Sequence, residues 1–555
     1  MDSLKNVIGL FFILVLSSLS SSVRSDLFPL SIIHINDFHA RFEPTDTFGG
    51  TCDDGEECIG GYARTVYTVR RLLEQQKHNN AIYLNAGDSF QGTLWYNIGR
   101  WKVTSQFLNM LPADAMTIGN HEFDHKIEGL VPFLETINSP MVAANIDASE
   151  EPTMQGLYQN SIIIERSGRK IGIIGVVLAT FYDLADTGNL KFLNESDVII
   201  EEAQKLKQQG VNIIIALTHC GYDVDQIIAE HAGAEIDIIV GSHSHTFLYT
   251  GDVMPGPDTP RGDYPTEIIH KDSGHRVLIV QAAAYAKYVG NITLFFDDNG
   301  DVVSYEGAPI YMSKDVEEDK EVLEAIAPWK EIVDEKGNVI VGSSRVALEK
   351  WPCESGECNL GNFFADALVH VFINASTFSQ ENKWTNVSIA LVNAGALRVP
   401  LNKGNLTYAH VVTMSPFENS LIALNLKGQY LLDTLEYSVN LVEAENGILS
   451  SRNMLQVSGL RIVYNFKNPP GKRVQDVQVK CSDCDIPRYL PLDKDQVYRI
   501  VTADFLANGG DGFTTLAAKG TDHEKYKTDI EALVEYINVA QPITTGLEGR
   551  IKVIY

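Results

Sequence analysis

The chain has 555 residues, more than one hydrophobic core ordinarily supports, and this length predicts about two to four domains. Hydrophobic residues make up 45% and charged residues 21% of the sequence, a globular composition that argues against long disordered tracts. The formal net charge of -28 repels nucleic acid polymers, and a site for any smaller anion would need local cations, which metal ions can supply.

Residues 1–25 have the pattern of a signal peptide. Lys5 precedes an apolar stretch from Val7 to Leu19, and Ser25 offers a small residue before a cleavage site. The apolar stretch is short for a membrane anchor, and polar serines follow it. The chain ends at Tyr555 without a hydrophobic tail that would signal a lipid anchor. We therefore expect a soluble protein outside the cell.

The cysteines and the glycosylation triplets also favour export. Six of the seven cysteines lie in close pairs, which predicts the short disulfides Cys52–Cys58, Cys353–Cys358 and Cys481–Cys484. A zinc site at Cys481 and Cys484 is the weaker alternative, because no second Cys or His pair lies nearby in the sequence. Cys220 is left over and is expected to be free. Asn-x-Ser/Thr acceptors occur at Asn194, Asn291, Asn374, Asn386 and Asn405.

From Leu30 to about Tyr311, apolar β-branched runs alternate with amphipathic stretches. The predicted strands are Leu30–Ile35, Ala81–Asn85, Ala115–Ile118, Ile171–Val177, Val211–Leu217 and Ile236–Val240. The helices predicted between them include Ala63–Lys77 and Val198–Gln209. This alternation predicts a layered α/β domain, to which we assign residues 26–313.

A charged segment with apolar residues at helical spacing follows this domain. Residues 314–335 predict a connecting helix that stops at Lys336-Gly337-Asn338, so the connection covers residues 314–338. The remaining residues, 339–555, mix helical and strand patterns and predict a second α/β domain. The helices expected there are Asn359–Phe372 and Gly428–Val442, and the strands are Ser388–Leu391 and Val497–Thr502.

Metal-ligand types of side chain follow five of the strands in the first domain. The segments are Asn36-Asp37-Phe38-His39, Gly87-Asp88-Ser89, Gly119-Asn120-His121-Glu122-Phe123-Asp124, Thr218-His219 and Gly241-Ser242-His243-Ser244-His245. In an open α/β sheet the carboxyl ends of the strands form the ligand crevice, so we expect these segments to converge. Asp, Asn and His suit zinc or manganese, and a carboxylate such as Asp88 can bridge two ions about 4 Å apart. One such segment alone is more often a turn or a cap, but five after apolar strands favour a metal site.

These motifs resemble a known family. Asp37-x-His39, Gly87-Asp88, Gly119-Asn120-His121-Glu122 and Gly241-Ser242-His243-Ser244-His245 are similar to the signature of calcineurin-like metallophosphoesterases. The strings from Gly119 to Asp124 and from Asn508 to Phe513 resemble the ecto-5'-nucleotidase and apyrase branch in particular. The resemblance covers nearly all of the chain after residue 28. It implies a layered metallophosphoesterase domain joined by a helix to an α/β nucleotide-binding domain.

The resemblance implies two divalent metal ions, with zinc favoured and calcium, magnesium or manganese as alternative activators. One ion would be held by Asp37, His39, Asp88 and His245, and the other by Asp88, Asn120, His219 and His243. His121 matches a catalytic residue that, as an imidazolium, would stabilise charge on the transferring phosphoryl group. Asp124 would orient its ring and keep it protonated. Water activated at the metals would attack phosphorus in line, without a covalent enzyme intermediate.

The second domain resembles the nucleotide-binding domain of the family. Asn393 and Arg398 match a motif whose Asn and Arg contact the nucleotide. Phe417 and Phe505 match two aromatic residues that stack on the base, although without the resemblance core packing would be the favoured interpretation. Asp511 matches a carboxylate that holds the ribose hydroxyls.

Three departures from the family pattern bear on function. Glu354 stands where the family has an arginine, so one phosphate-contacting cation is expected to be missing. One usual disulfide of the second domain has no counterpart, and the anchor tail is absent, as in the secreted salivary apyrases of blood-feeding arthropods, which this chain resembles most. We expect a salivary apyrase that removes phosphate from ATP and ADP and limits ADP-driven platelet aggregation. A soluble 5'-nucleotidase that converts AMP to adenosine is the alternative, because both activities need the same metals and base clamp.

A tripeptide suggests a function of another class. Arg261-Gly262-Asp263 is an integrin-binding motif, and it lies in the Gly- and Pro-rich stretch Gly251–Pro265, which predicts an exposed loop. Because tripeptides match by chance, an ordinary solvated loop is the favoured interpretation.

Overall fold

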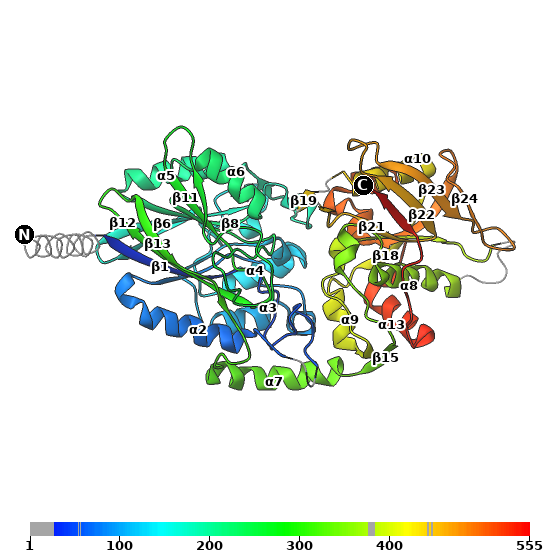
Figure 1. Cartoon of the computed structure of the whole chain (residues 1–555), viewed down its shortest axis with the longest axis horizontal. Coiled ribbons are helices and arrows are strands. Elements are labelled where there is room, and N and C mark those ends of the chain that lie inside the picture. The colour runs from blue at the N-terminus through cyan, green and yellow to red at the C-terminus, as the bar shows by residue number, and fades with distance from the viewer. Residues whose placement is uncertain (1–26, 54, 56, 376–382, 441–442, 446–447) are drawn as a thin grey trace, which may run out of the picture.

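The computed structural model describes residues 27–53, 55, 57–375, 383–440, 443–445 and 448–555. Two α/β domains lie side by side, and the long helix α7 runs beneath them from one to the other (Figure 1). The predicted signal peptide, residues 1–25, lies outside the described residues. Within the described ranges, no helix has both the length and the apolar character that crossing a membrane requires.

The first domain contains two mixed six-stranded sheets. One has the order β13-β12-β1-β2-β3 with β14 paired to β12, and the other has the order β10-β11-β9-β8-β6-β5. The strands of the first sheet are β1 (Phe28–Ile35), β2 (Ile82–Asn85), β3 (Ala115–Met116), β12 (Tyr288–Phe296), β13 (Val302–Gly307) and β14 (Ile310–Tyr311). Those of the second are β5 (Ser161–Arg166), β6 (Arg169–Val177), β8 (Ile213–His219), β9 (Ile238–Val240), β10 (Thr266–Ile269) and β11 (Arg276–Val280). A separate short pair is formed by β4 (Ile146–Asp147) and β7 (Lys191–Phe192).

The two sheets share a buried apolar layer, and helices cover their outer faces. Leu30 and Ile32 of β1 join Ile215 of β8 in one hydrophobic cluster, whereas Ile33 and Ile35 join a second cluster. This division follows from the strand period, because successive side chains point to opposite faces. The second cluster includes residues of α2 (Tyr62–Gln75), α3 (Leu94–Leu108) and α4 (Lys126–Thr136), and the first includes residues of α5 (Glu195–Gln208) and α6 (Tyr222–Ala232). The predicted layered α/β architecture is confirmed.

Helix α7 (Lys320–Gly337) connects the domains. The carboxylate of Asp319 accepts hydrogen bonds from the backbone N–H groups of Glu321 and Val322 at 3.1 and 3.2 Å. The predicted start at Lys314 was therefore wrong, because this N-cap begins the helix at Lys320. The helix ends at Gly337, inside the predicted stop.

The second domain is built on a five-stranded sheet of order β21-β16-β25-β18-β26 and a four-stranded sheet of order β24-β23-β22-β27. Their strands are β16 (Ile389–Asn393), β18 (Ser420–Lys427), β21 (Leu455–Ser458), β22 (Leu460–Asn465), β23 (Val474–Lys480), β24 (Tyr489–Pro491), β25 (Val497–Ala503), β26 (Thr521–Thr528) and β27 (Ile551–Ile554). Two short pairs join β15 (Ile340–Ser344) to β17 (Gly404–Thr407) and β19 (Glu443–Glu445) to β20 (Ile448–Ser450). Its helices are α8 (Asn359–Ala375), α9 (Tyr408–Met414), α10 (Gly428–Ser438), α11 (Asp504–Ala507), α12 (Thr514–Lys519) and α13 (Asp529–Ala540). The predicted second α/β domain is thus confirmed.

The domains are held together by apolar and polar contacts. One hydrophobic cluster continues from the first domain through α7 to residues of α8 and α13. Arg100 pairs with Glu418 across the boundary, and the Asn97 amide donates a hydrogen bond to the carbonyl of Pro416 at 3.0 Å. These contacts fix the segment that carries Phe417 against the first domain.

All three predicted disulfides are present. The bonds join Cys52 to Cys58, Cys353 to Cys358 and Cys481 to Cys484. Cys220 is a free thiol, as expected, and it is buried directly after β8.

Candidate active site

The predicted metal ligands converge at the carboxyl edges of both sheets of the first domain. They are Asp37 and His39 after β1, Asp88 after β2, Asn120 after β3, His219 at the end of β8, and His243 and His245 after β9. The sequence predicted convergence at the edge of one open sheet, whereas two sheets contribute ligands. Because the two sheets pack against each other, the carboxyl ends of their strands still lie close together.

These side chains form two groups that share Asp88. Asp37, His39, Asp88 and His245 offer ligand atoms that all lie within 4.8 Å of one another, and so do Asp88, His219 and His243. The side-chain oxygen of Asn120 lies 2.9 Å from Nδ1 of His243, which adds it to the second group. The geometry thus brings every predicted ligand into a two-centre arrangement.

The chemical state of these donors fits divalent metal ions. Nε2 of His219 is buried and lies 3.2 Å from Oδ2 of Asp88, but it makes no hydrogen bond among the described residues. Burial lowers the pKa of His39, His243 and His245 well below the usual value, so their imidazoles are neutral. Burial raises the pKa of Asp88, but the charge of His219 and then that of His121 outweigh it, and the net pKa is well below the usual value. Neutral imidazole and ionised carboxylate are the forms that bind metals, and His39, His243, His245 and Asp88 already have them. Burial lowers the pKa of His219, but the charge of Asp88 outweighs burial and raises the pKa to about 9, so metal binding at His219 would release a proton.

The backbone at the ligands is strained. The left-handed φ angles are 49° at Asp37, 50° at His39, 55° at Asp88, 74° at His243 and 57° at His245. Such conformations cost on the order of 1–3 kcal/mol per residue outside glycine and cluster at functional sites. Hydrogen bonds hold them in place, since the N–H of Asp37 donates to the Gly87 carbonyl at 3.0 Å and that of His39 to the Asp88 carbonyl at 2.9 Å.

Gly119 is required by the close approach of Asp88. A Cβ at Gly119 would lie 2.1 Å from Oδ1 of Asp88, far inside contact distance. That same oxygen accepts a hydrogen bond from the backbone N–H of His121 at 3.0 Å. The absent side chain therefore lets the Asp88 carboxylate reach both the metal groups and the following turn.

Glu122 ties two metal-binding loops together. Its buried carboxylate accepts hydrogen bonds from the backbone N–H groups of Gly119, Ser89, Asp88 and Phe90 at 2.6, 2.7, 3.0 and 3.2 Å. The motif that contains Glu122 resembled the family signature, but it predicted no role for this residue. No local signal marks this role, because three of its four partners lie more than thirty residues away in the chain.

His121 and Asp124 form a pair beside the metal groups. Nδ1 of His121 lies 2.8 Å from Oδ2 of Asp124, and neither residue belongs to the two ligand groups. Burial lowers the pKa of His121, but the charges of Asp124 and Asp88 outweigh burial and raise it above the usual value. The ring therefore keeps its proton to a higher pH than a free imidazole does.

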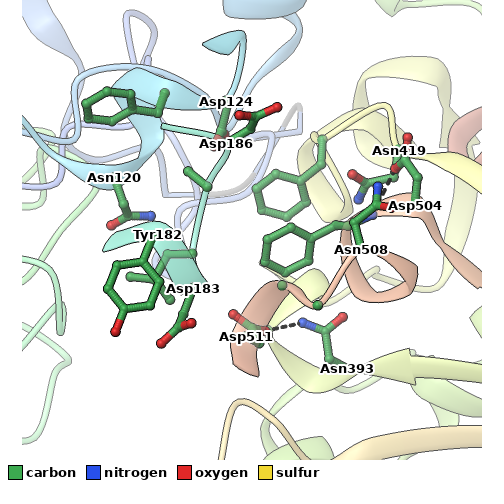
Figure 2. Close-up of a pocket in the computed structure, with 18 of the residues that line it drawn as sticks. Asn120, Asp124, Tyr182, Asp183, Asp186, Asn393, Asn419, Asp504, Asn508 and Asp511 are labelled. Atoms are coloured by element: carbon green, nitrogen blue, oxygen red, sulfur yellow. Dashed lines mark hydrogen bonds between the residues drawn. The ribbon is translucent and has the colours of Figure 1, made fainter. Parts of the chain in front are cut away.

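A pocket of about 1260 Å³ lies between the domains. Asn120 and Asp124 line it from the first domain, and Asn393 and Asp511 face them from the second (Figure 2). The Asn393 amide donates a hydrogen bond to the Asp511 carboxylate at 2.6 Å. Burial raises the pKa of Asp511 to about 6 against the opposing effect of that hydrogen bond. Asp511 also has a left-handed φ of 53°, a conformation that is uncommon outside glycine.

Both aromatic residues expected to hold the base line this pocket. The ring of Phe417 stacks on that of His121 with centroids 5.7 Å apart, and the Arg398 guanidinium also lies 5.7 Å from the Phe417 centroid. Phe505 packs partly against the core of the second domain, and a Cβ at Gly510 would come within 2.4 Å of its ring. Phe417 therefore lines the pocket, whereas Phe505 both lines the pocket and packs against the core of the second domain.

Arg41 and Tyr285 are buried beside the first metal group and were not singled out from sequence. The Arg41 guanidinium lies 4.1 Å from the centroid of the Tyr285 ring, which in turn lies 5.2 Å from that of His245. Tyr285 also lies within electrostatic reach of Arg398 of the second domain. Burial raises the pKa of Tyr285, but the charges of Arg398 and Arg41 outweigh it and lower the pKa to about 8. No local signal marks Tyr285, because its partners are distant in the sequence.

The Arg261-Gly262-Asp263 tripeptide is not among the residues that line the pocket. Arg261 and Asp263 are exposed, as predicted. The backbone N–H of Arg261 donates to the carbonyl of Phe247 at 2.9 Å, and its guanidinium pairs with Asp223 at 2.9 Å. The arginine of the motif is therefore already engaged within the chain.

Family models match both domains. Residues 30–247 match the calcineurin-like phosphoesterase family, and residues 340–518 match the 5'-nucleotidase C-terminal domain. Apyrase from Tabanus yao is 49% identical over 528 residues, which cover 95% of this chain and 94% of the relative. The chain belongs to the 5'-nucleotidase and apyrase family.

Two further similarities extend over the whole molecule. A 5'-nucleotidase-related protein from Glossina morsitans morsitans is 46% identical over 100% of both chains. The crystal structure of a 5'-nucleotidase precursor from Thermus thermophilus is 34% identical and covers 95% of this chain and 99% of its own, with a TM-score of 0.84. This family member is a metal-dependent, nucleotide-hydrolysing hydrolase with the two-domain fold.

Proposed function

We propose that this family member is a secreted apyrase that hydrolyses extracellular ATP and ADP to AMP and phosphate. The observation that carries the proposal is the pocket between the domains, in which Asn120 and His243 of the metal groups face Asn393 and Arg398. Its volume of about 1260 Å³ exceeds the roughly 300–1,000 Å³ of most small-molecule sites. It has room for a nucleoside with a chain of phosphates. The similarity to an apyrase at 49% identity supports the same substrates.

The proposed metal assignment follows the two ligand groups. One ion would bind Asp37, His39, Asp88 and His245, and the other would bind Asp88, Asn120, His219 and His243. Zinc suits this mixture of imidazole and carboxylate ligands best, with manganese, magnesium or calcium as alternative activators.

When bound, the two ions would neutralise charge on the attacked phosphate and activate a water molecule. The protein would supply the remaining stabilisation. His121, oriented by Asp124 through Nδ1, would direct Nε2–H at a phosphoryl oxygen and stabilise the charge that develops there. Glu122 would keep the Asp88 and Asn120 loops in register during the reaction.

The second domain would hold the nucleoside. Phe417 and Phe505 would stack on the base, an interaction that tolerates different bases. Asp511 would accept hydrogen bonds from the ribose hydroxyls after the Asn393 amide is released to the substrate. Arg398 would contact the phosphates as a charged donor.

A soluble 5'-nucleotidase that converts AMP to adenosine is the second candidate. The relative from Glossina morsitans morsitans is named a 5'-nucleotidase-related protein, and a 5'-nucleotidase from Mus musculus is 36% identical over 532 residues, which cover 94% of this chain. Glu354 favours the apyrase by analogy with the family, because it replaces the arginine that was expected to contact a phosphate, and its carboxylate pairs with Lys350 at 2.9 Å.

Secretion is supported by the signal-peptide pattern of residues 1–25 and by three disulfides. Outside the cell, and in saliva in particular, destruction of ADP would prevent ADP-driven platelet aggregation. Expression in cultured cells tests the first step, because the enzyme is expected in the medium with a mature N-terminus near Asp26. Retention inside the cells would contradict secretion.

Phosphate release tests the substrate assignment. The purified chain is incubated with ATP, ADP or AMP at equal concentration, with and without added divalent ions. We expect phosphate from ATP and ADP, AMP as the end product, and no activity after chelation. Release of phosphate from AMP alone would make the 5'-nucleotidase the correct assignment.

A further inference from the structure

Arg452 lies on a loop that is anchored at the edge of the pocket. Its backbone carbonyl accepts a hydrogen bond from the N–H of Gly395 at 2.8 Å. The preceding residue, Ser451, donates its N–H to the carbonyl of Glu354 at 2.6 Å, and the following residue, Asn453, donates its side-chain amide to the carbonyl of Asp511 at 3.1 Å. These three hydrogen bonds therefore fix the position of the Arg452 backbone, from which its side chain extends.

The guanidinium of Arg452 is available to a ligand. Arg452 lines the pocket and is exposed, and across the described part of the chain no ion pair involves it. The other lysine and arginine residues of the lining already have partners, because Lys126 pairs with Asp186 at 2.7 Å and the Arg398 guanidinium lies over the Phe417 ring, 5.7 Å from its centroid. The chain has a net charge of -28, so an arginine without an ion pair on the pocket wall stands out as a site for an anion.

Arg452 is near the metal groups as well as the nucleoside wall. It lines the same pocket as Asn120 and His243 of the metal groups in the first domain. Asp511 of the second domain lines that pocket too, and the residue after Arg452, Asn453, donates to the Asp511 carbonyl. A position within electrostatic reach of both walls is where the phosphate chain of a bound nucleotide would pass.

We propose that Arg452 binds the phosphate next to the one under attack and thereby favours nucleoside di- and triphosphates over monophosphates. This inference rests on the proposed apyrase function. When water attacks the terminal phosphorus of ADP, the bond to the bridging oxygen breaks and its electron pair stays on the AMP that leaves. The guanidinium can donate two hydrogen bonds to that phosphate and offset its charge. AMP places its only phosphate at the metals and offers Arg452 no second anion.

The test is an Arg452→Gln substitution assayed on ADP, AMP and p-nitrophenyl phosphate. Loss of a charge-assisted contact is expected to lower kcat/KM for ADP by about tenfold or more, while the two monophosphates change less than about twofold. Arg452→Lys keeps the charge and should recover part of the loss. Arg488→Gln, which removes an exposed arginine that does not line the pocket, is the matched control and should leave all three substrates unchanged.

A binding measurement separates this inference from the proposed function. Calorimetry with a methylene-bridged ADP analogue and with AMP should show weaker binding of the analogue alone in Arg452→Gln. Equal losses for all ligands, or no loss for the ADP analogue, would overturn the role of Arg452. Failure of the unsubstituted enzyme to hydrolyse ATP and ADP would instead overturn the apyrase proposal, and the calorimetry would still decide whether Arg452 recognises a second phosphate.

Discussion

The two walls of the pocket are built in different ways. The metal wall of the first domain consists of side chains that are buried or nearly so, on backbone held in left-handed conformations by hydrogen bonds such as that from His39 to Asp88. The wall of the second domain presents half-buried or exposed residues such as Phe417, Phe505 and Arg452. Metal ligands must hold fixed distances, which requires rigid and buried support, whereas base stacking and phosphate contacts tolerate a more open surface. Substitutions should therefore have larger effects on the first wall than on the second.

Asp88 is the residue on which the metal wall depends most. Asp88→Ala should abolish phosphate release, as chelation does, because the carboxylate is shared by both ligand groups. Metal content measured by mass spectrometry should fall, and circular dichroism should show a folded chain. Undiminished hydrolysis by this variant would rule out the two-metal assignment.

His121→Ala should lower kcat by about two to four orders of magnitude, because in the proposed mechanism it removes a charged donor that would act on the transition state. Its metal content should remain intact, since His121 belongs to neither ligand group. Loss of bound metal in this variant would show that His121 is a ligand after all.

Gly119→Ala tests whether close packing supports the metal wall. The new Cβ would meet Oδ1 of Asp88 at 2.1 Å, so the carboxylate must move, and a shift of that size is expected to cost about a hundredfold in activity. Gly546→Ala is the control, because nothing lies within 4 Å of a Cβ there. Equal activity of the two variants would mean that the Asp88 loop adapts without cost.

Phe417→Ala and Phe505→Ala test the second wall. Either change should raise KM for nucleotides by the equivalent of about 1–3 kcal/mol of lost stacking. Phosphoesters without a base should be unaffected by Phe505→Ala, whereas Phe417→Ala should also lower their kcat slightly, because Phe417 packs on the His121 ring. If Phe505→Ala damages both substrate types equally, its main role is core packing.

The smallest effect is expected at Arg261-Gly262-Asp263, outside both walls. Asp263→Glu should leave nucleotide hydrolysis unchanged, because the tripeptide does not line the pocket. Asp88→Ala protein should not block fibrinogen binding to activated platelets, since Arg261 already pairs with Asp223. A block by this inactive protein that disappears on Asp263→Glu would establish integrin binding instead.

Much of the metal wall could be predicted from the sequence. Apolar β-branched runs such as Leu30–Ile35 and Ala81–Asn85 predicted strands, and those strands are present with ends shifted by at most two residues. Ligand types at their carboxyl ends then predicted convergence. The start of α7 was missed, because the choice of Asp319 as N-cap over the preceding charged residues depends on a local hydrogen-bond geometry that periodicity does not reveal.

The sequence by itself determined the strands, the ligand types that follow them, the disulfide pairs and, through its motifs, the family. These features depend on residues that are close along the chain, so the period of apolar side chains and the spacing of motifs reveal them. Only the tertiary structure decided that Glu122 clamps the Asp88 loop, that Tyr285 meets Arg398 of the other domain, and that Arg452 lines the pocket between the two walls. Those roles arise from contacts between segments far apart in the sequence. They form only when burial of the apolar layers packs the two domains against each other.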